Sequence, residues 1–312
     1  VYTPPPLAVT GGAKGTDYTY ADGVLTVKTA TALTVANTTP GTAVTDRIVV
    51  DSADGANITL SGVNIDVSAA SNAAAFKIAS TAGAVNLTLA DGSANTLKSG
   101  ENCAGLQKDN TPALLTIRGG ASGTGTLNAT GGTYGAGIGG GNGGGGSHIT
   151  ISGGIITATG SGYDSGNSGA GIGGGSKGSG SDISISGGQI TAAGSYNGAG
   201  IGGGGSANIG GTCGSVTITG GTVFANGGLW RGAGIGGGGG VSSGAGGTVI
   251  ITGGSVKALG GGNGAAIGAG AANSSKGTDN GTLTNGAQTP VNVQLCTLTV
   301  KDVNDNPLAY TA

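Results

Sequence analysis

The sequence predicts an all-β fold: a right-handed, three-sided parallel β-helix (β-solenoid) of about seven coils, with cap strands at its N-terminal end. One observation behind this prediction is a glycine-rich heptapeptide, Gly-Ala-Gly-Ile-Gly-Gly-Gly, that begins at Gly135, Gly169, Gly198 and Gly232, with a diverged copy at Gly264. Its isoleucines are separated by 34, 29, 34 and 32 residues, and they are Ile138, Ile172, Ile201, Ile235 and Ile267. Such a period is typical of proteins built from stacked, equivalent units.

The other observation is that each period also contains two stretches of alternating apolar and polar residues. The first set of stretches is 57–60, 86–89, 114–117, 148–151, 182–185, 215–218 and 248–251. The second set follows after glycine-containing turns or short linkers, at 64–67, 96–99, 126–129, 155–158, 189–192, 222–225 and 255–258. The heptapeptide, with relatives at 74–76 and 103–106, supplies a third strand per coil. Alternation predicts that some side chains point inward. Examples are Ile149, Ile151, Ile156 and Ala158, with Thr150 and Thr157 facing water.

A β-helix buries one face of every strand without using α-helices. No segment shows the i, i+3, i+4, i+7 spacing that an amphipathic helix requires, which excludes a helical repeat. Coils stacked at the spacing of hydrogen-bonded strands rise about 4.8 Å each. Because crossovers between parallel strands are right-handed, we expect a right-handed coil.

The chain divides into three predicted regions. Residues 1–44 form an N-terminal linker, with a polyproline-type spacer, and cap strands that cover the open end of the first coil. Residues 45–285 form the parallel β-helix. Residues 286–312 form C-terminal strands that either cap the last coil or begin a truncated immunoglobulin-like module. The chain contains no methionine, and we expect a monomeric module of a larger, processed multidomain protein.

Charged residues are scarce, at 8% of the chain, and the formal net charge is -2. This composition lacks the basic surface that nucleic-acid binding requires, so we expect no nucleic-acid partner. No apolar run is long enough to span a bilayer, so we expect no direct membrane insertion. The three cysteines allow at most one disulfide, and they are Cys103, Cys213 and Cys296. The abundance of Thr, Ser, Asn and Gly favours an extracellular or bacterial cell-surface location.

The heptapeptide contains the pattern G-x-G-x-x-G of dinucleotide-binding proteins. That pattern binds a cofactor only where it joins a strand to a helix, and here it recurs with no helix after it. We therefore expect no nucleotide and no organic cofactor. The glycines suit a tight corner with closely packed backbones, and the isoleucine suits an inward-facing core position. The alternative is a bare backbone surface that faces a ligand, and the corner interpretation is favoured.

Aromatic residues number only ten, and four of them share one position in the repeat. Tyr134, Tyr163, Tyr196 and Trp230 precede the first glycine of a heptapeptide by one to six residues. One ring per coil would form an exposed ladder with a rise of about 5 Å, similar to the repeat of an extended glucan. Because sugar rings stack on aromatic faces, we predict a carbohydrate-binding set. The alternative is that these rings cover the apolar corner of the neighbouring coil.

Acidic residues concentrate in the first half of the chain. Asp51, Asp54 and Asp109 are expected at similar coil corners near Asn carbonyls, an oxygen-rich set that suits calcium as a cofactor. A polysaccharide lyase would also need a base, and the candidates for it are Lys77, Lys98 and Arg118. No coil carries a cluster of three acids, so we predict no catalytic residue and no enzyme activity.

Part of the chain resembles a known family. The segments that carry the likeness read RIVV at 47–50, NITLSGVNI at 57–65, AAF at 74–76 and LTLADGSANTL at 87–97. They resemble clostridial-type carbohydrate-binding parallel β-helix surface proteins with a polysaccharide-lyase-like fold, and the likeness covers roughly residues 45–270. The resemblance implies binding of plant polysaccharides and acidic sugars, bound calcium and no demonstrated lyase activity. It assigns no ligand to a particular residue of this chain.

Three hypotheses of function follow. The first is non-catalytic polysaccharide binding or adhesion at a bacterial cell surface. The alternatives are a structural surface stalk without a ligand, and a polysaccharide lyase or hydrolase. The only histidine, His148, is expected at the surface because no carboxylate lies near it in the sequence. A row of outward hydroxyls is also expected, which is usual on β-solenoids, although a flat threonine face can bind ice. Its members are Thr59, Thr88, Thr116, Thr150, Ser184 and Thr217.

Overall fold

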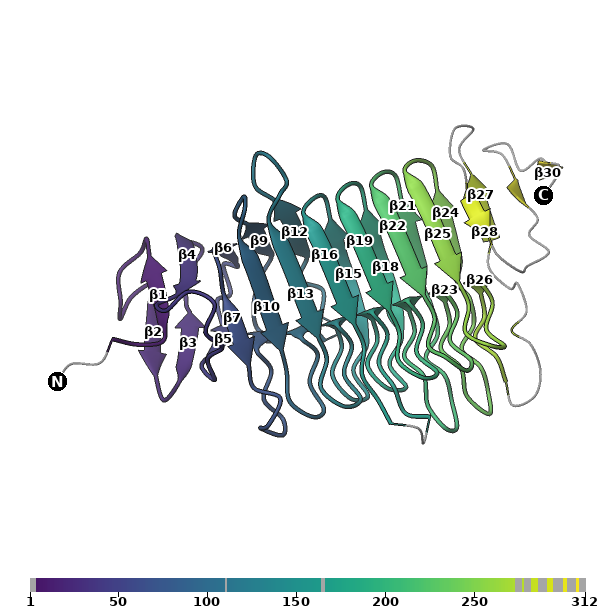
Figure 1. Cartoon of the computed structure of the whole chain (residues 1–312), viewed down its shortest axis with the longest axis horizontal. Coiled ribbons are helices and arrows are strands. Elements are labelled where there is room, and N and C mark those ends of the chain that lie inside the picture. The colour runs from purple at the N-terminus through teal and green to yellow at the C-terminus, as the bar shows by residue number, and fades with distance from the viewer. Residues whose placement is uncertain are drawn as a thin grey trace.

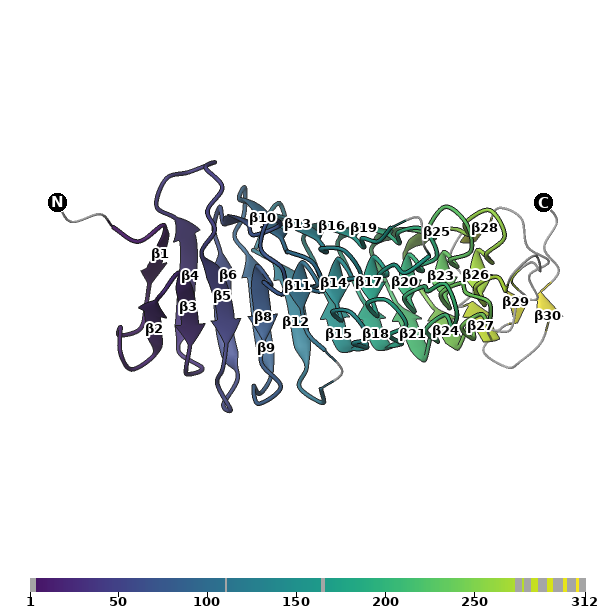
Figure 2. The same ribbon diagram turned by 90° about the horizontal axis from the view of Figure 1, so that it is seen from below.

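The computed structural model describes residues 4–109, 111–163, 166–272 and 277 and, beyond these, the backbone of four short strands. Figure 1 shows an elongated body in which strands lie side by side from the N-terminal to the C-terminal end. Figure 2 shows the same stack turned by 90°, with a row of shorter strands between the longer ones. Within the described residues, no helix is long and apolar enough to cross a membrane.

The strands form three sheets, here called sheets A, B and C. Sheet A contains, in spatial order, β1 (Leu7–Thr10), β4 (Ala32–Asn37), β6 (Ala56–Leu60), β9 (Val85–Leu89), β12 (Leu115–Gly119), β15 (Gly146–Ile151), β18 (Gly180–Ile185), β21 (Ser215–Ile218), β24 (Thr248–Ile251), β27 (Thr282–Asn285), β29 (Val300–Lys301) and β30 (Pro307–Leu308). Sheet B contains β2 (Tyr18–Ala21), β3 (Val24–Val27), β5 (Arg47–Val50), β8 (Phe76–Ile78), β11 (Leu106–Gln107), β14 (Ile138–Gly139), β17 (Ile172–Gly173), β20 (Ile201–Gly202), β23 (Ile235–Gly236) and β26 (Ile267–Gly268). Sheet C contains, from the N-terminal end, β7 (Asn64–Asp66), β10 (Ala94–Lys98), β13 (Thr126–Thr130), β16 (Ile155–Thr159), β19 (Gln189–Ala193), β22 (Thr222–Asn226), β25 (Ser255–Leu259) and β28 (Val291–Val293).

Each coil passes through sheet B, then sheet A, then sheet C, and each strand pairs in parallel with its counterpart in the next coil. Seven complete coils, from β5–β7 to β23–β25, lie within the described residues. We name each coil after its strand in sheet B. The predicted all-β parallel β-solenoid of about seven coils is confirmed.

Antiparallel strands close the N-terminal end of the stack. In sheet A, β1 pairs antiparallel with β4, and in sheet B, β2 pairs antiparallel with β3. The strands β3 and β4 already pair in parallel with β5 and β6, so the parallel stack reaches back beyond residue 45. An antiparallel strand covers an open sheet edge that would otherwise invite pairing with another chain.

The described strands near the C-terminus continue the same sheets. In sheet A, β27 pairs in parallel with β24, and in sheet C, β28 pairs in parallel with β25. The last strands follow, with β29 parallel to β27 and β30 antiparallel to β29. Cys296 lies outside the residues that the structure describes.

Alternation along each strand fills the interior, as predicted. Ile149 and Ile151 are completely buried, Ile156 is 1% exposed and Ala158 is completely buried, whereas Thr157 is exposed. The inward-facing Ile, Leu, Val and Ala side chains of successive coils form one continuous core. Its members stack coil upon coil, so each coil buries the apolar face of the next.

The heptapeptide is a corner with an inward-facing isoleucine, as predicted. The isoleucine amide of one copy donates to the next copy, as Ile138 N does to Gly171 O at 3.0 Å. Within each copy the second residue donates to the sixth, as Ala136 N does to Gly140 O at 3.0 Å. Gly173 has a φ of 131°, and a Cβ there would overlap the carbonyl oxygen of Gly202. Only glycine fits this corner, because the backbones of successive coils touch there.

Two predicted alignments are wrong by two residues, one in sheet C, where Leu97 pairs with Ala129 and not with Leu127, and one in sheet A. In sheet A, Leu115 pairs with Val85, so Thr116 lies beside Asn86 and not beside Thr88. A slip of two keeps every side chain on its own face, so the alternation pattern cannot detect it. The single predicted hydroxyl row is therefore two rows. The first is Thr34, Thr59 and Thr88, and the second is Thr116, Thr150, Ser184 and Thr217.

Candidate functional site

The four predicted aromatic residues lie in the loops that lead from sheet C to sheet B, and they meet in two pairs. The rings of Tyr134 and Tyr163 are 6.0 Å apart between centroids, edge to face at 79°. The rings of Tyr196 and Trp230 are 5.4 Å apart and nearly parallel, at 18°. Among the residues described, the predicted even ladder is thus two contacting pairs, of which only the second is stacked.

Two of these aromatic residues have an unusual backbone conformation. Tyr134 has a φ of 74° and Tyr196 a φ of 40°. At the corresponding corners of two upstream coils, Asn72 and Asn102 have φ values of 59° and 69°. Asparagine adopts this left-handed region readily, whereas a bulky side chain rarely does. A tyrosine in that conformation carries a local cost in free energy, and this cost points to a role for its ring.

A pocket of about 350 Å³ lies at this corner, and Tyr163 forms one of its walls. The lining residues come from four successive coils, so the pocket follows the long axis of the stack. Most of the lining side chains carry hydroxyl groups, and these are Ser68, Ser71, Ser99, Thr130, Thr133 and Ser161. The ring of Tyr163 is exposed, since the residue is 60% accessible. The pocket therefore combines an aromatic wall with a hydroxyl-rich floor.

Two charged side chains line the pocket, Lys98 and Glu101. The ammonium of Lys98 donates to Asp66 Oδ2 at 3.1 Å. The hydroxyl of Ser68 donates to the other oxygen of Asp66, and this bond is the main reason why the pKa of Asp66 lies below its ordinary value. Ser71 Oγ donates to Glu101 Oε2 at 3.3 Å. The polar groups of the pocket are thus held in place by one another.

The second aromatic pair has a more apolar setting. Trp230 is 54% exposed, and the neighbouring Leu229 is 81% exposed. The loop that carries them is tied to the loop on the other side of sheet B, because Arg231 Nη1 donates to Gly240 O at 3.4 Å. That second loop carries the exposed Val241. An exposed leucine thus adjoins Trp230 in the sequence, whereas Tyr163 lines a pocket of mainly polar side chains.

The three predicted calcium ligands do not form a cage. Asp51 accepts a hydrogen bond from Thr81 at 2.8 Å and lies 3.8 Å from the ammonium of Lys28. Asp109 accepts from Gln107 Nε2 at 3.0 Å and from Gly141 N at 3.1 Å, two coils away from Asp51. Asp54 is exposed. In the part of the chain that the structure describes, no three His, Cys, Asp or Glu side chains group as a metal site. Calcium binding stays a prediction that these contacts do not support.

The three basic residues considered for a lyase lie on three different sheets. Lys77 projects from β8 in sheet B, Lys98 from β10 in sheet C and Arg118 from β12 in sheet A. Arg118 Nε donates to Thr88 Oγ1 at 3.0 Å, and Lys98 is paired with Asp66. The three candidates for a base therefore do not lie together at one site.

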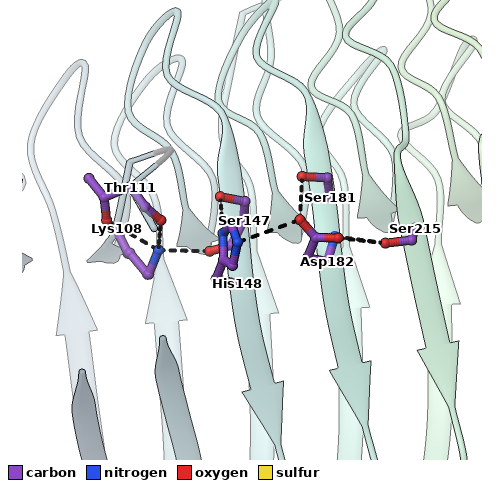
Figure 3. A network of polar contacts seen from close by, with 7 residues as sticks. All are labelled: Lys108, Thr111, Ser147, His148, Ser181, Asp182 and Ser215. Carbon is purple, nitrogen blue, oxygen red and sulfur yellow. Dashed lines mark hydrogen bonds and ion pairs between the residues drawn. The ribbon is translucent and has the colours of Figure 1, made fainter. Parts of the chain in front are cut away.

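A polar network that the sequence did not reveal lies where sheet B leads into sheet A (Figure 3). His148 Nδ1 is 3.0 Å from Ser147 Oγ, and His148 Nε2 is 3.8 Å from Asp182 Oδ2. Asp182 Oδ1 accepts from Ser215 Oγ at 2.8 Å. The partner carboxylate of His148 is distant in sequence but occupies the same place in the next coil. Adding the 34-residue period to His148 identifies Asp182.

Lys108 belongs to the buried end of this network, as does Ser147. It is completely buried, and its Nζ donates to Ser147 O at 2.8 Å and to Thr111 O at 3.0 Å. Burial lowers the pKa of Lys108 to about 8, although the Asp109 carboxylate acts in the opposite direction. The network ties the end of β11 to the start of β15. Its partners are carbonyl oxygens, so it is a brace between coils.

A larger pocket, of about 570 Å³, lies at the other edge of sheet C near the N-terminal end. Its walls include Asn37, Asn64, Thr96 and Asp91. The Asp91 carboxylate accepts the backbone N–H of Ser122 at 2.9 Å, and this bond is the main reason that the pKa of Asp91 is lowered. These walls offer amide, hydroxyl and carboxylate groups.

Comparison with known proteins supports the fold. Four segments of the chain, 122–142, 149–176, 183–205 and 216–239, match a family model described as a beta helix repeat. The match begins just before β13 and reaches β23, so it covers the coils that contain the glycine heptapeptides. No curated protein and no solved structure matches the chain at a significant level. The chain is a parallel β-helix that contains β-helix repeats.

Proposed function

We propose that this protein is a non-catalytic polysaccharide-binding or adhesion module of a bacterial cell-surface protein. The observation that carries the proposal is the pocket of about 350 Å³ with the exposed Tyr163 ring as a wall. A few polar groups beside an exposed aromatic face are the usual composition of a sugar site. The chain is proposed to act as a monomeric module of a larger extracellular protein.

The pocket provides both kinds of contact that a sugar needs. The face of a pyranose ring is apolar and packs on an aromatic ring, which loses little conformational freedom on binding. The hydroxyls of the sugar exchange hydrogen bonds with Thr130, Thr133 and Ser161, which line the same pocket. Because the pocket follows the axis across four coils, it suits an extended chain more than a single sugar.

The positive φ of Tyr134 gives independent support. The residue bears a strained backbone, and its ring holds the edge of Tyr163 in place. Strain that persists at one corner is typical of binding sites. Tyr196 and Trp230 are proposed as an extension of the same surface toward the C-terminal end.

The test is retention on insoluble polysaccharides and affinity electrophoresis in soluble ones. Tyr163→Ala is expected to weaken binding about tenfold, the loss expected for one stacking ring. Tyr163→Phe keeps the ring and serves as the matched control, with binding within about twofold of the wild type. An unchanged unfolding midpoint in both variants shows that the fold is intact.

Three outcomes would contradict the proposal. Absence of retention on every polysaccharide would favour the structural stalk. Equal binding by Tyr163→Ala and the wild type would remove the ring from the site. Appearance of the ultraviolet absorbance of unsaturated uronates on pectic substrates would show a lyase.

A further inference from the structure

We infer that the pocket beside Tyr163 prefers uncharged polysaccharides to polysaccharides of uronic acids. This inference rests on the proposed function and specifies the substrate class of the same site. It follows from the charges that surround the pocket and from what each charge already contacts.

The charged groups at the pocket are two carboxylates and one ammonium. Lys98 and Glu101 line it, and Asp66 contacts Lys98 directly. Together they leave one negative charge at the site. Among the described residues that line the pocket, Lys98 is the sole cation. A uronate carboxylate would therefore enter a region of like charge.

Lys98 is already paired with a carboxylate of the protein. Its ammonium lies 3.1 Å from Asp66 Oδ2, and Asp66 is itself held by two hydrogen bonds from Ser68. Those bonds lower the pKa of Asp66, so that carboxylate stays ionised at neutral pH. A uronate at Lys98 would share an ammonium whose charge Asp66 already offsets.

Glu101 remains as the uncompensated charge. Its carboxylate accepts a hydrogen bond from the hydroxyl of Ser71, at 3.3 Å, and the backbone carbonyl of the same residue accepts from Asn72 N at 2.9 Å. A hydroxyl donor orients a carboxylate but does not neutralise its charge. A hydroxyl at carbon 6 can donate to the remaining lone pairs of Glu101, whereas the ionised carboxylate that replaces it in a uronate cannot.

The remaining lining groups suit a neutral ligand. The hydroxyls of Thr130, Thr133 and Ser161 both donate and accept, as sugar hydroxyls do. None of them supplies the charge that would offset desolvation of a carboxylate. The site therefore favours binding of ligand hydroxyl groups over binding of ligand carboxylates.

One unscreened like charge at about 6 Å changes affinity roughly a hundredfold at the effective dielectric constant of a protein surface and about threefold in bulk water, so about tenfold is expected for a pocket that is open to solvent. Salt reduces this effect because the Debye length falls to about 8 Å at physiological ionic strength. The expected discrimination is therefore about tenfold at low salt and smaller at high salt.

The experiment compares matched polysaccharides that differ only at carbon 6. A β-glucan, a galactan and a mannan are used beside the C6-oxidised form of each, with affinity electrophoresis and titration calorimetry at low and high salt. The wild type is expected to bind a neutral polymer about tenfold more tightly than its oxidised form. Glu101→Gln is expected to reduce this ratio of affinities to about threefold or less, because the oxidised form binds more tightly to the variant.

Asp22→Asn is the matched control, because it removes one exposed carboxylate in the turn between β2 and β3, away from the pocket. It is expected to leave the preference unchanged. Tighter binding of an oxidised polymer by the wild type, or an unchanged preference in Glu101→Gln, would overturn the inference while the proposed function stands. Absence of binding to all six polymers would overturn both.

Discussion

The β8 coil and the β17 coil have different residues at equivalent positions of sheet B and just after it. In the β8 coil, Phe76 and Ile78 point into the core and are nearly or completely buried. In the β17 coil, Ile172 takes the place of Phe76, and the bare backbone of Gly174 takes the place of Ile78. The upstream coils are packed by side chains, and the downstream coils are packed by backbone at this corner. The first kind of packing tolerates a smaller side chain at the cost of a cavity, whereas the second cannot accept even a methyl group.

Lys108 lies at the junction between the two kinds of coil. The register places it after Ile78 of one coil and before Gly140 of the next. Its aliphatic stem replaces the isoleucine, and its ammonium reaches carbonyl oxygens of the glycine-rich side. The pocket beside Tyr163 also takes residues from both kinds of coil. Lys108 and the pocket beside Tyr163 thus both lie where the packing changes.

The largest effect is expected from Gly173→Ala. The new Cβ would overlap the carbonyl oxygen of Gly202, and the φ of 131° is one that alanine rarely adopts. We expect a loss of about 4 kcal/mol or more in the free energy of unfolding, measured by urea denaturation.

The matched control for that variant is Gly143→Ala. Gly143 has a φ of 74°, but no atom lies within 4 Å of the position that the new methyl group would take, so only backbone strain of about 1 kcal/mol is expected. Equal losses in the two variants would show that the glycine corner is not packed by backbone.

The next effect is expected from Phe76→Ala in a side-chain-packed coil. Truncation of this fully buried ring leaves a cavity, and we expect a loss of about 3–5 kcal/mol. Ile172→Val in a glycine coil removes one methylene and should cost about 1 kcal/mol. Urea denaturation of both variants gives the comparison. A loss below about 1 kcal/mol for Phe76→Ala would contradict side-chain packing of the upstream coils.

A smaller effect is expected from the pH dependence of Lys108. Burial lowers its pKa to about 8 in the folded state, below the ordinary value of 10.5, so the unfolded chain binds more protons between these values. Stability from this group therefore rises with pH from about 8 to 10.5, by about 1–3 kcal/mol.

The measurement is the difference in unfolding free energy between the wild type and Lys108→Met at several pH values. The difference cancels the contributions of the other titratable groups, which are common to both proteins. The unfolding free energy of the wild type should increase relative to that of Lys108→Met as the pH rises. A difference that is constant from pH 7 to pH 10 would contradict a depressed pKa.

The sequence predicted most of the fold because repeats and alternation report directly on buried faces. The spacing of Ile138 and its equivalents located the coils, and the alternation around Ile149 and Ile151 located the core. The register of β12 was not predictable from the same signal, since a two-residue slip preserves the faces. The antiparallel pairing of β1 and β2 was also missed, because pairing direction leaves no mark in a short strand.

The candidate site was predictable only in part. The shared position of the aromatic residues in the repeat indicated one corner, and the structure places all four there. Their pairing depends on loop length, which differs from coil to coil and was not readable from residue types. The burial of Lys108 could not be predicted from the sequence, because a lysine beside an aspartate is typical of an exposed loop.

The proposed recognition takes place where the two kinds of coil meet, in the pocket beside Tyr163, and not along the glycine-packed corner. The most direct test compares two double variants in the same polysaccharide retention assay. Tyr134→Ala with Tyr163→Ala is expected to reduce affinity by about tenfold or more, and Tyr196→Ala with Trp230→Ala by about threefold or less. A larger loss in the second double variant, or no loss in the first, would contradict the account.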